Sequence, residues 1–207
     1  MFNIYNRLCF PGGVLNMKKN LLLIILVFLL AFTYEVSAQE IPLEKIDFVG
    51  GITYNTFDGT YVENGAIYDD EYNINNGIGM HIGGKYWLNK MNAIETGFDM
   101  TRSFGDTTKL NGPYALFIRK PYDFLSLKGG LAYYSMSFAD EATYGNGLGY
   151  LLGGSHHYSL DDKLSVLVSV DYRIAYIDIK KRYGTDMIDT YLNMSGFRIS
   201  GGASLKF

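Results

Sequence analysis

The residues best suited to chemistry gather in one short segment, Ser155-His156-His157-Tyr158-Ser159. A histidine beside a serine can act as the general base for a serine nucleophile, and an acidic residue that orients the imidazole would complete a triad. His157 and Ser159 are two residues apart, so in a β-strand their side chains lie on the same face. The segment therefore raises one hypothesis of nucleophilic catalysis, which depends on whether these two side chains meet.

Metal binding is the second chemistry to consider. Neighbouring strand residues face opposite ways, so His156 and His157 do not share a ligand site with His81. The acidic segment 58–72 offers oxygen ligands that calcium accepts, but their spacing fits no EF-hand, and we interpret the segment as a solvated loop. Its acidic residues are Asp58, Glu63, Asp69, Asp70 and Glu71. Several glycine pairs resemble phosphate-binding loops only superficially, because no helix follows them. We expect no metal, no cofactor and no nucleotide.

The composition excludes several classes of protein. The chain has 207 residues, a formal net charge of -3 and a single cysteine, Cys9. A nucleic-acid-binding protein that works through a basic surface is therefore not expected. One cysteine cannot build a disulfide framework. Hydrophobic residues make up 48% of the chain and charged residues only 19%, yet outside the N-terminal region the apolar residues are dispersed rather than collected into long runs.

The N-terminal region has the features of a secretory signal. Lys18 and Lys19 precede an apolar run over residues 21–32, and Val36-Ser37-Ala38 follows with small residues at its first and last positions. A charged start, a short apolar stretch and a small-x-small exit are the parts of a signal peptide. We expect a signal peptide at residues 17–38, preceded by a non-native extension at 1–16 and followed by a mature domain at 39–207. A retained membrane anchor is the alternative, although the run is shorter than the roughly 20 residues that a spanning helix needs.

From Ile46 onward the chain alternates apolar with small or polar residues in eight segments, which turn-forming clusters separate. In the first, Ile52 and Tyr54 alternate with Thr53 and Asn55. Period-two alternation predicts strands, so we expect eight of them. In the fourth segment the same rule puts Tyr114, Leu116 and Ile118 on the apolar face, and Ala115, Phe117 and Arg119 on the other.

The two faces differ in a way that distinguishes membrane from soluble barrels. One face is large, aliphatic and almost uncharged, with Arg102 and Lys120 as exceptions. The other is rich in glycine, serine and alanine and carries charges of both signs that could pair in an enclosed interior. We predict a lumen charge network of Asp47, Lys85, Glu95, Asp99, Arg119, Lys128, Asp171, Arg173, Arg198 and Lys206. A soluble lipocalin-like barrel would show the opposite arrangement, so the pattern favours an all-β, eight-stranded antiparallel up-and-down transmembrane β-barrel.

The links between the segments alternate between long and tight. The long links are 58–72, 105–112, 139–146 and 180–189, and the tight ones are 89–92, 120–123 and 161–163. Bacterial outer-membrane barrels have short periplasmic turns and longer extracellular loops. We therefore expect the four long links to face the outside of the cell.

The last segment ends in alternating apolar residues and a terminal aromatic, Ala203, Leu205 and Phe207. This ending resembles the C-terminal strand of the small OmpX/OmpA-like outer-membrane β-barrel family. The resemblance covers residues 39–207 and implies a monomer in the bacterial outer membrane, surrounded by its lipid, whose last strand is read by the barrel-assembly machinery. It carries no catalytic motif. The spacing of His157 and Ser159 is similar to that in the lipid A deacylase PagL, but the segment adjoins a tight turn at the periplasmic end, whereas PagL acts from the outer leaflet.

We therefore expect a non-enzymatic protein with a structural or surface-interaction role through its extracellular loops, which would bind an unidentified surface ligand. Tyrosines in or beside these loops would supply adhesive contacts. They are Tyr61, Tyr68, Tyr72, Tyr144 and Tyr183. The alternatives are a lipid A-modifying enzyme, a narrow channel, and an accessory protein in secretion or envelope assembly.

Overall fold

The computed structural model describes residues 45–68, 74–104, 108–138 and 143–207. The chain divides into two units, Met1–Ile41 and Pro42–Phe207, and all described residues belong to the second. The predicted extension at 1–16 and signal peptide at 17–38 lie outside the described residues. Across the described ranges, no helix has the length and apolarity to cross a membrane.

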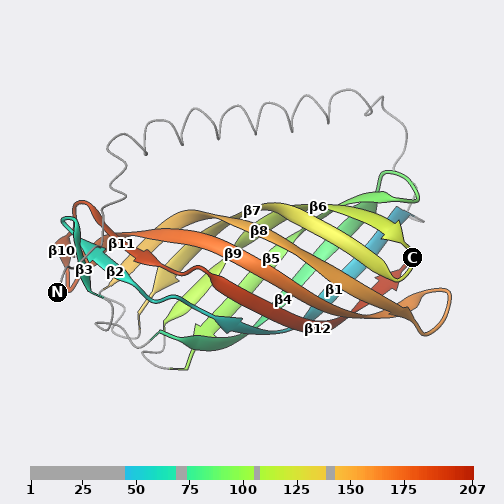
Figure 1. Cartoon of the computed structure of the whole chain (residues 1–207), viewed down its shortest axis with the longest axis horizontal. Helices are drawn as coiled ribbons and strands as arrows, with labels where there is room; N and C mark the ends of the chain where they lie inside the picture. Colours follow the sequence, from blue (N-terminus) through green and yellow to red (C-terminus); the bar gives the residue numbers. More distant parts are fainter. Residues whose placement is uncertain (1–44, 69–73, 105–107, 139–142) are drawn as a thin grey trace, which may run out of the picture. The chain divides into compact units, whose positions relative to one another are not determined.

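The described unit is built from strands (Figure 1). They are β1 (Ile46–Thr56), β2 (Tyr61–Glu63), β3 (Ala66–Tyr68), β4 (Asn76–Trp87), β5 (Asn92–Ser103), β6 (Lys109–Tyr122), β7 (Leu125–Ser137), β8 (Tyr144–Ser159), β9 (Leu164–Arg182), β10 (Thr185–Asp186), β11 (Thr190–Asn193) and β12 (Gly196–Lys206). Eight of these pair antiparallel in the order β12-β1-β4-β5-β6-β7-β8-β9, and β12 also pairs with β9. That last pairing closes the barrel, so the predicted eight-stranded antiparallel barrel is confirmed.

Alternate residues of the strands lie on the outside and the inside of the barrel. Ile52 and Leu152 point outward and are 64% and 71% exposed, whereas Thr53 and Asn55 are fully buried. Closure gives every barrel strand two hydrogen-bonded neighbours and leaves no free edge, which is the condition for crossing a membrane with strands. The large aliphatic face therefore surrounds the barrel, as predicted.

One strand faces the opposite way from the prediction. In β6, Tyr114, Leu116 and Ile118 are buried inside, whereas Phe117 and Arg119 are exposed outside. The prediction assigned the more apolar set to lipid, but Tyr114 and Leu116 pack against other apolar residues within the barrel. Ile118 is buried beside the small polar cavity of the interior. Both faces of β6 carry apolar residues, so hydrophobicity alone did not determine the side. The placement of Arg119 in the lumen is therefore wrong.

The interior has two regions. Near the loop ends of the strands lies the apolar cluster, which consists of Phe57, Tyr61, Ile74, Leu110, Tyr114, Leu116, Ala132, Tyr134, Met136, Phe138, Leu151, Ala175, Ile177, Ile179, Leu192 and Met194. The other region, toward the tight turns, is polar and contains most of the predicted charges. The interior is thus not uniformly polar. Gly149 lies under the Tyr134 ring, where an added Cβ would approach to 2.8 Å, so glycine makes room for this ring.

The tight links predicted from the sequence are turns in the structure, between β4 and β5, β6 and β7, and β8 and β9. The long links at the other end are more ordered than predicted. Segment 58–68 forms the β2–β3 hairpin, and segment 183–193 contributes β10 and β11. Asn64-Gly65 and Tyr183-Gly184 close these hairpins, with all four φ angles between 49° and 82°. Two consecutive positive φ values are typical of the type I′ hairpin turn.

Candidate functional site

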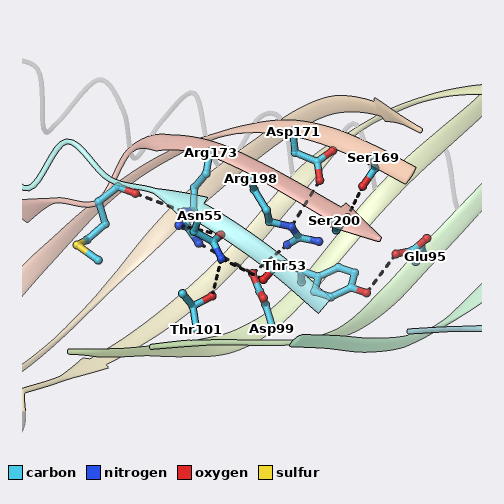
Figure 2. A network of polar contacts seen from close by, with 12 residues as sticks. Thr53, Asn55, Glu95, Asp99, Thr101, Ser169, Asp171, Arg173, Arg198 and Ser200 are labelled. Carbon is cyan, nitrogen blue, oxygen red and sulfur yellow. Dashed lines mark hydrogen bonds and ion pairs between the residues drawn. The ribbon is translucent and has the colours of Figure 1, made fainter. Parts of the chain in front are cut away.

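A buried charge network occupies the middle of the barrel (Figure 2). Arg198 contacts two carboxylates, with Nη1 2.9 Å from Asp99 Oδ2 and Nε 3.5 Å from Asp171 Oδ2. Lys128 Nζ lies 3.0 Å from the other oxygen of Asp171, and Arg173 Nη1 lies 4.0 Å from Asp99 Oδ2. Charges inside a barrel are tolerated when they are paired in this way. The network connects β5, β7, β9 and β12 across the lumen.

Arg173 stands at the boundary between the polar and apolar regions. Its Nη2 donates to Asn55 Oδ1 at 3.4 Å and its Nε donates to the backbone oxygen of Met194 at 3.3 Å. The guanidinium carbon lies 4.9 Å from the Phe57 ring centroid and 5.4 Å from that of Tyr134. Arginine suits this position because its planar group can accept aromatic packing and donate hydrogen bonds at once.

A second set of polar contacts lies closer to the turns. Lys85 Nζ is 3.8 Å from Glu95 Oε2, and the Tyr114 hydroxyl donates to Glu95 Oε1 at 3.1 Å. Trp87 Nε1 donates to Asp47 Oδ2 at 2.8 Å. Trp87 therefore points toward the lumen mouth.

Most of the predicted lumen residues are where the sequence placed them. Asp47, Lys85, Glu95, Asp99, Asp171, Arg173 and Arg198 are buried, and Lys128 is partly buried. Lys206 is exposed but lines the cavity at the mouth of the barrel, whereas Arg119 lies outside. Lys120, which we had expected on the lipid face, lines the same cavity because it alternates with Arg119. Tyr114 was not predicted as a member of the network, because the prediction placed its face of β6 against lipid instead of in the lumen.

The histidine–serine segment does not form the predicted pair. His157 Nε2 lies 2.9 Å from Ser126 Oγ and 3.0 Å from Ser155 Oγ. Ser159 Oγ instead lies 3.4 Å from Ser165 Oγ and 3.5 Å from the backbone oxygen of Asp161. The strand does put His157 and Ser159 on one face. The imidazole of His157, however, forms its hydrogen bonds with the nearer hydroxyl groups of Ser126 on β7 and Ser155 on β8.

The other histidines are separated from this group. His156 faces outward with its ring centroid 5.8 Å from that of Phe124, and His81 is buried in the polar region. Within the described residues, no group of three or more histidine, cysteine or acidic side chains is arranged to hold a metal ion. Asp69, Asp70 and Glu71 of the acidic loop lie outside the described residues.

A cavity of about 880 Å³ opens at the tight-turn end of the barrel, and we call it the vestibule. Its wall includes Lys85, Trp87, Lys120, His157 and Lys206. A cavity of only about 20 Å³ lies in the polar region next to it, with His81 and Lys128 in its lining. The vestibule is thus a blind chamber, because the apolar cluster fills the loop half of the barrel.

At the opposite end, β2, β3, β10 and β11 form a small sheet on the extension of β9, which we call the loop sheet. Arg182 holds it together: Nη1 is 3.6 Å from Glu63 Oε2, and the guanidinium carbon is 5.4 Å from the Tyr61 ring centroid. Burial and the hydrogen bond to Glu63 raise the pKa of Tyr61 to about 12. Tyr61 therefore remains a neutral donor at any physiological pH.

The outer surface has the aromatic girdles of a membrane-spanning barrel. At the loop end, Tyr54 pairs with Phe104 and Tyr176 pairs with Tyr191, with ring centroids 6.5 Å and 5.9 Å apart. At the turn end, Phe48 packs edge-on against Phe207 at 5.1 Å. Between these rings the outward side chains are almost entirely apolar, including Ile52, Ile78, Met80, Ile82, Phe98, Leu127, Leu152, Val168, Val170, Ile174 and Ile199.

Comparisons with known proteins identify solved structures but no sequence relative. No protein-family model matches the chain, and no curated protein matches it either. The crystal structure of the outer membrane protein OprG from Pseudomonas aeruginosa is similar at a TM-score of 0.49 and 14% identity, covering 78% of this chain and 95% of that chain. Neisserial surface protein A is similar at 0.48 and 15%, covering 78% and 97%. The Escherichia coli outer membrane protein W is similar at 0.43 and 14%, covering 76% and 98%.

The location follows from this chain's own surface. A closed barrel with an apolar belt, two aromatic girdles, tight turns at one end and long links at the other is a bacterial outer-membrane barrel. The protein thus has the fold and the location that the OmpX/OmpA-like resemblance implied. Because outer-membrane barrels have short periplasmic turns and longer extracellular loops, we expect the turn end to face the periplasm and the loop sheet to face the outside of the cell.

Proposed function

We propose that this protein is a non-enzymatic outer-membrane barrel with a structural or surface-interaction role, and that the loop sheet makes the contact. The length of β9 carries this proposal. Its 19 residues span about 60 Å at 3.3 Å per residue, well beyond the 9–11 residues that a tilted strand needs to cross the bilayer. The excess raises the sheet above the membrane, where it can meet a partner.

The exposed side chains of the loop sheet support a binding role. Ile67, Tyr183 and Ile188 are 67%, 72% and 77% exposed. Burying large apolar side chains of this kind against a partner is favourable, because it removes apolar surface from water. The Arg182 contacts and the two type I′ turns preorganise these side chains, which lowers the entropic cost of binding.

The interior supports this role over the two main alternatives. Tyr134 and Met136 of the apolar cluster are fully buried and fill the loop half of the lumen, so a path for ions would have to displace them. A lipid A-modifying enzyme would need a serine activated by His157 near the outer leaflet. His157 instead contacts Ser126 and Ser155 near the periplasmic turns. An accessory role in envelope assembly stays compatible with a contact made through the loop sheet.

The last strand is proposed as the assembly signal. Ala203 and Leu205 point outward from β12, the strand that closes the barrel, and Phe207 directly after it is also exposed. Because these side chains face outward, another protein can bind them before the barrel is closed. We propose that the barrel-assembly machinery binds them during biogenesis, and that the folded protein is a monomer surrounded by outer-membrane lipid.

The surface role is tested by a triple variant, Ile67→Ser, Tyr183→Ser and Ile188→Ser, expressed on cells that are assayed for attachment to host-cell or abiotic surfaces. Attachment should fall at least about tenfold if these residues form the contact. Leu160→Ser is the matched control, since Leu160 is equally apolar and 55% exposed but lies at the turn end. Both proteins should keep the faster gel mobility of an unboiled barrel. Unchanged attachment in the triple variant would remove the proposal.

A further inference from the structure

The vestibule carries an excess of positive charge. It is lined by six lysines, Lys45, Lys85, Lys90, Lys120, Lys163 and Lys206. Against these stand three aspartates, Asp47, Asp123 and Asp162. Like charges around a concave, low-dielectric chamber reinforce one another and raise the local concentration of ions of opposite sign. The vestibule therefore attracts anions.

The protein's own acids neutralise only part of this charge, since Glu95 pairs with the buried Lys85 at 3.8 Å but the other acids hold their lysines weakly or not at all. Asp47 accepts the Trp87 indole N–H, and Asp123 pairs with Lys120 at 3.6 Å while remaining fully open to water. Such an exposed pair contributes little and can be exchanged for a better partner. Lys163 and Lys206 form no ion pair with any residue that the structure describes. Several cations are thus available to a ligand.

Trp87 forms a fixed part of the vestibule wall. Lys85 Nζ is 5.7 Å and Lys120 Nζ is 6.0 Å from the centroid of its indole ring. The hydrogen bond to Asp47 at 2.8 Å fixes the ring orientation. Lys85 is 2% exposed, so its ammonium group is held by the barrel instead of moving freely in solvent. Because Lys85 is paired with Glu95, Lys120 is the ammonium group beside this fixed ring that a ligand can reach.

The volume of the vestibule and its closed inner end determine the size of ligand that it can bind and the path by which a ligand enters and leaves. A volume of about 880 Å³ lies within the range of small-molecule sites. The cavity of about 20 Å³ next to it admits about one water molecule, and the apolar cluster lies above both. A ligand that enters from the periplasm must therefore leave by the same opening.

We propose that the vestibule is a binding site for a small soluble polyanion that bears phosphate or carboxylate groups and enters from the periplasm. Lys120 contacts the anionic groups beside the Trp87 ring, and Lys163 and Lys206 extend the site toward the rim. Lys85, which is buried and paired with Glu95, adds positive charge from within the wall. This site is independent of the loop sheet, which lies at the other end of the barrel.

Trp87 is the single tryptophan of the chain, so its fluorescence reports on the vestibule alone. The barrel, refolded in zwitterionic micelles, is titrated with sodium tripolyphosphate. We expect a saturable fluorescence change whose apparent Kd rises with added salt, because salt screens the lysines. Lys120→Gln should raise the apparent Kd about tenfold, since a charge-assisted contact is lost. Lys206→Gln gives a second reading if Lys120→Gln does not fold.

Lys109→Gln is the matched control, because Lys109 is exposed on the outward face at the loop end of β6. It removes the same charge and should leave the apparent Kd unchanged. The proposal is overturned if tripolyphosphate gives no saturable change, or if Lys109→Gln weakens binding as much as Lys120→Gln. A repeat in phosphatidylglycerol vesicles separates soluble anions from lipid headgroups. Retained tripolyphosphate binding supports the proposal, whereas its loss would assign the vestibule to headgroups instead.

Discussion

The two halves of the barrel interior fill the lumen with different kinds of side chain. Beneath the loop sheet the strands interlock through the apolar cluster, which includes fully buried Tyr134, Met136, Ile177 and Leu192. Toward the periplasm the space is bridged by charges, centred on Arg198 between Asp99 and Asp171. Apolar packing closes a barrel without directional requirements, whereas a charge network fixes which strands face one another but depends on every partner.

The difference matches what each end supports. The apolar half lies directly below the loop sheet, and Tyr61, Leu192 and Met194 of the cluster come from the segments that build or adjoin that sheet. Packing inside the lumen therefore also anchors the surface outside the cell. The polar half borders the open vestibule, where water reaches the outermost charges.

Removing the central cation should have the largest effect. Arg198→Ala leaves the carboxylates of Asp99 and Asp171 buried with weaker partners, which should cost about 3–5 kcal/mol in the free energy of unfolding. Urea unfolding in lipid vesicles, followed by Trp87 fluorescence, measures this cost. Arg119→Ala, on the outer surface, is the control and should change stability by less than about 0.5 kcal/mol. Equal effects of the two variants would mean that the network does not hold the polar half together.

A cavity in the apolar half should cost somewhat less but should also loosen the loop sheet. Leu192→Ala should lower the free energy of unfolding by about 2–4 kcal/mol, since Leu192 is fully buried in the apolar cluster. Proteolysis of intact cells should then cleave segment 183–193 faster than in the unsubstituted protein. Ile67→Ala, at an exposed position of β3, should leave both quantities nearly unchanged. A destabilised barrel whose loop sheet keeps its protease resistance would show that the two are uncoupled.

The hairpin turns of the loop sheet should be sensitive to smaller changes. Gly65 has a φ of +80°, so Gly65→Ala forces an alanine into the left-handed region and should destabilise the β2–β3 hairpin by about 1 kcal/mol. Hydrogen exchange of the β2 amides would measure this. Gly201→Ala is the comparison, because Gly201 is extended and nothing lies near its added Cβ. If the two variants exchange alike, strain at the turn is not the cause.

The smallest expected effect is at a periplasmic turn. Asp161 Oδ1 accepts the backbone N–H groups of Leu164 at 2.7 Å and Lys163 at 2.8 Å, and these hydrogen bonds lower the pKa of its carboxyl group below the usual 3.8. Because the folded-state pKa is depressed, the stabilisation is present at neutral pH and is lost as pH falls through that value. The protection of the Leu164 amide, measured relative to its intrinsic exchange rate at each pH, should therefore fall below about pH 4. Asp161→Asn should abolish this pH dependence, and its persistence would place the titrating group elsewhere.

Much of the barrel could be predicted from the sequence because lipid imposes one strict rule on its outer face. In β1, β5, β12 and residues 164–176 of β9 most outward residues are apolar and most inward ones are small or polar, so the alternation predicted both the strand and the side. The rule failed in β6, since Tyr114 and Leu116 are as apolar as the residues that face lipid. Which apolar set turns inward depends on the apolar cluster, and this is assembled from strands distant in sequence.

The sites were less predictable than the fold. The strand period correctly placed most of the charged residues inside, but not the partners of Arg198, because the register and stagger that bring β5, β9 and β12 together are not visible in one strand. The loop sheet did have a local signal in the sequence, since Asn64-Gly65 is a pair typical of type I′ hairpins and lies within the predicted long link 58–72. The vestibule had none, since its lysines come from the start of β1, the ends of β4, β6 and β12, and two separate turns.

The central claim is that the apolar cluster closes the barrel toward the outside while the vestibule opens to the periplasm. Labelling of single cysteines with a membrane-impermeant maleimide tests it directly, in a chain that lacks Cys9. Ile188→Cys on the loop sheet should react in intact cells, whereas Ser165→Cys in the vestibule should react only after the outer membrane is permeabilised. Labelling of Ser165→Cys in intact cells would contradict the account, because it would require an open lumen or the opposite orientation.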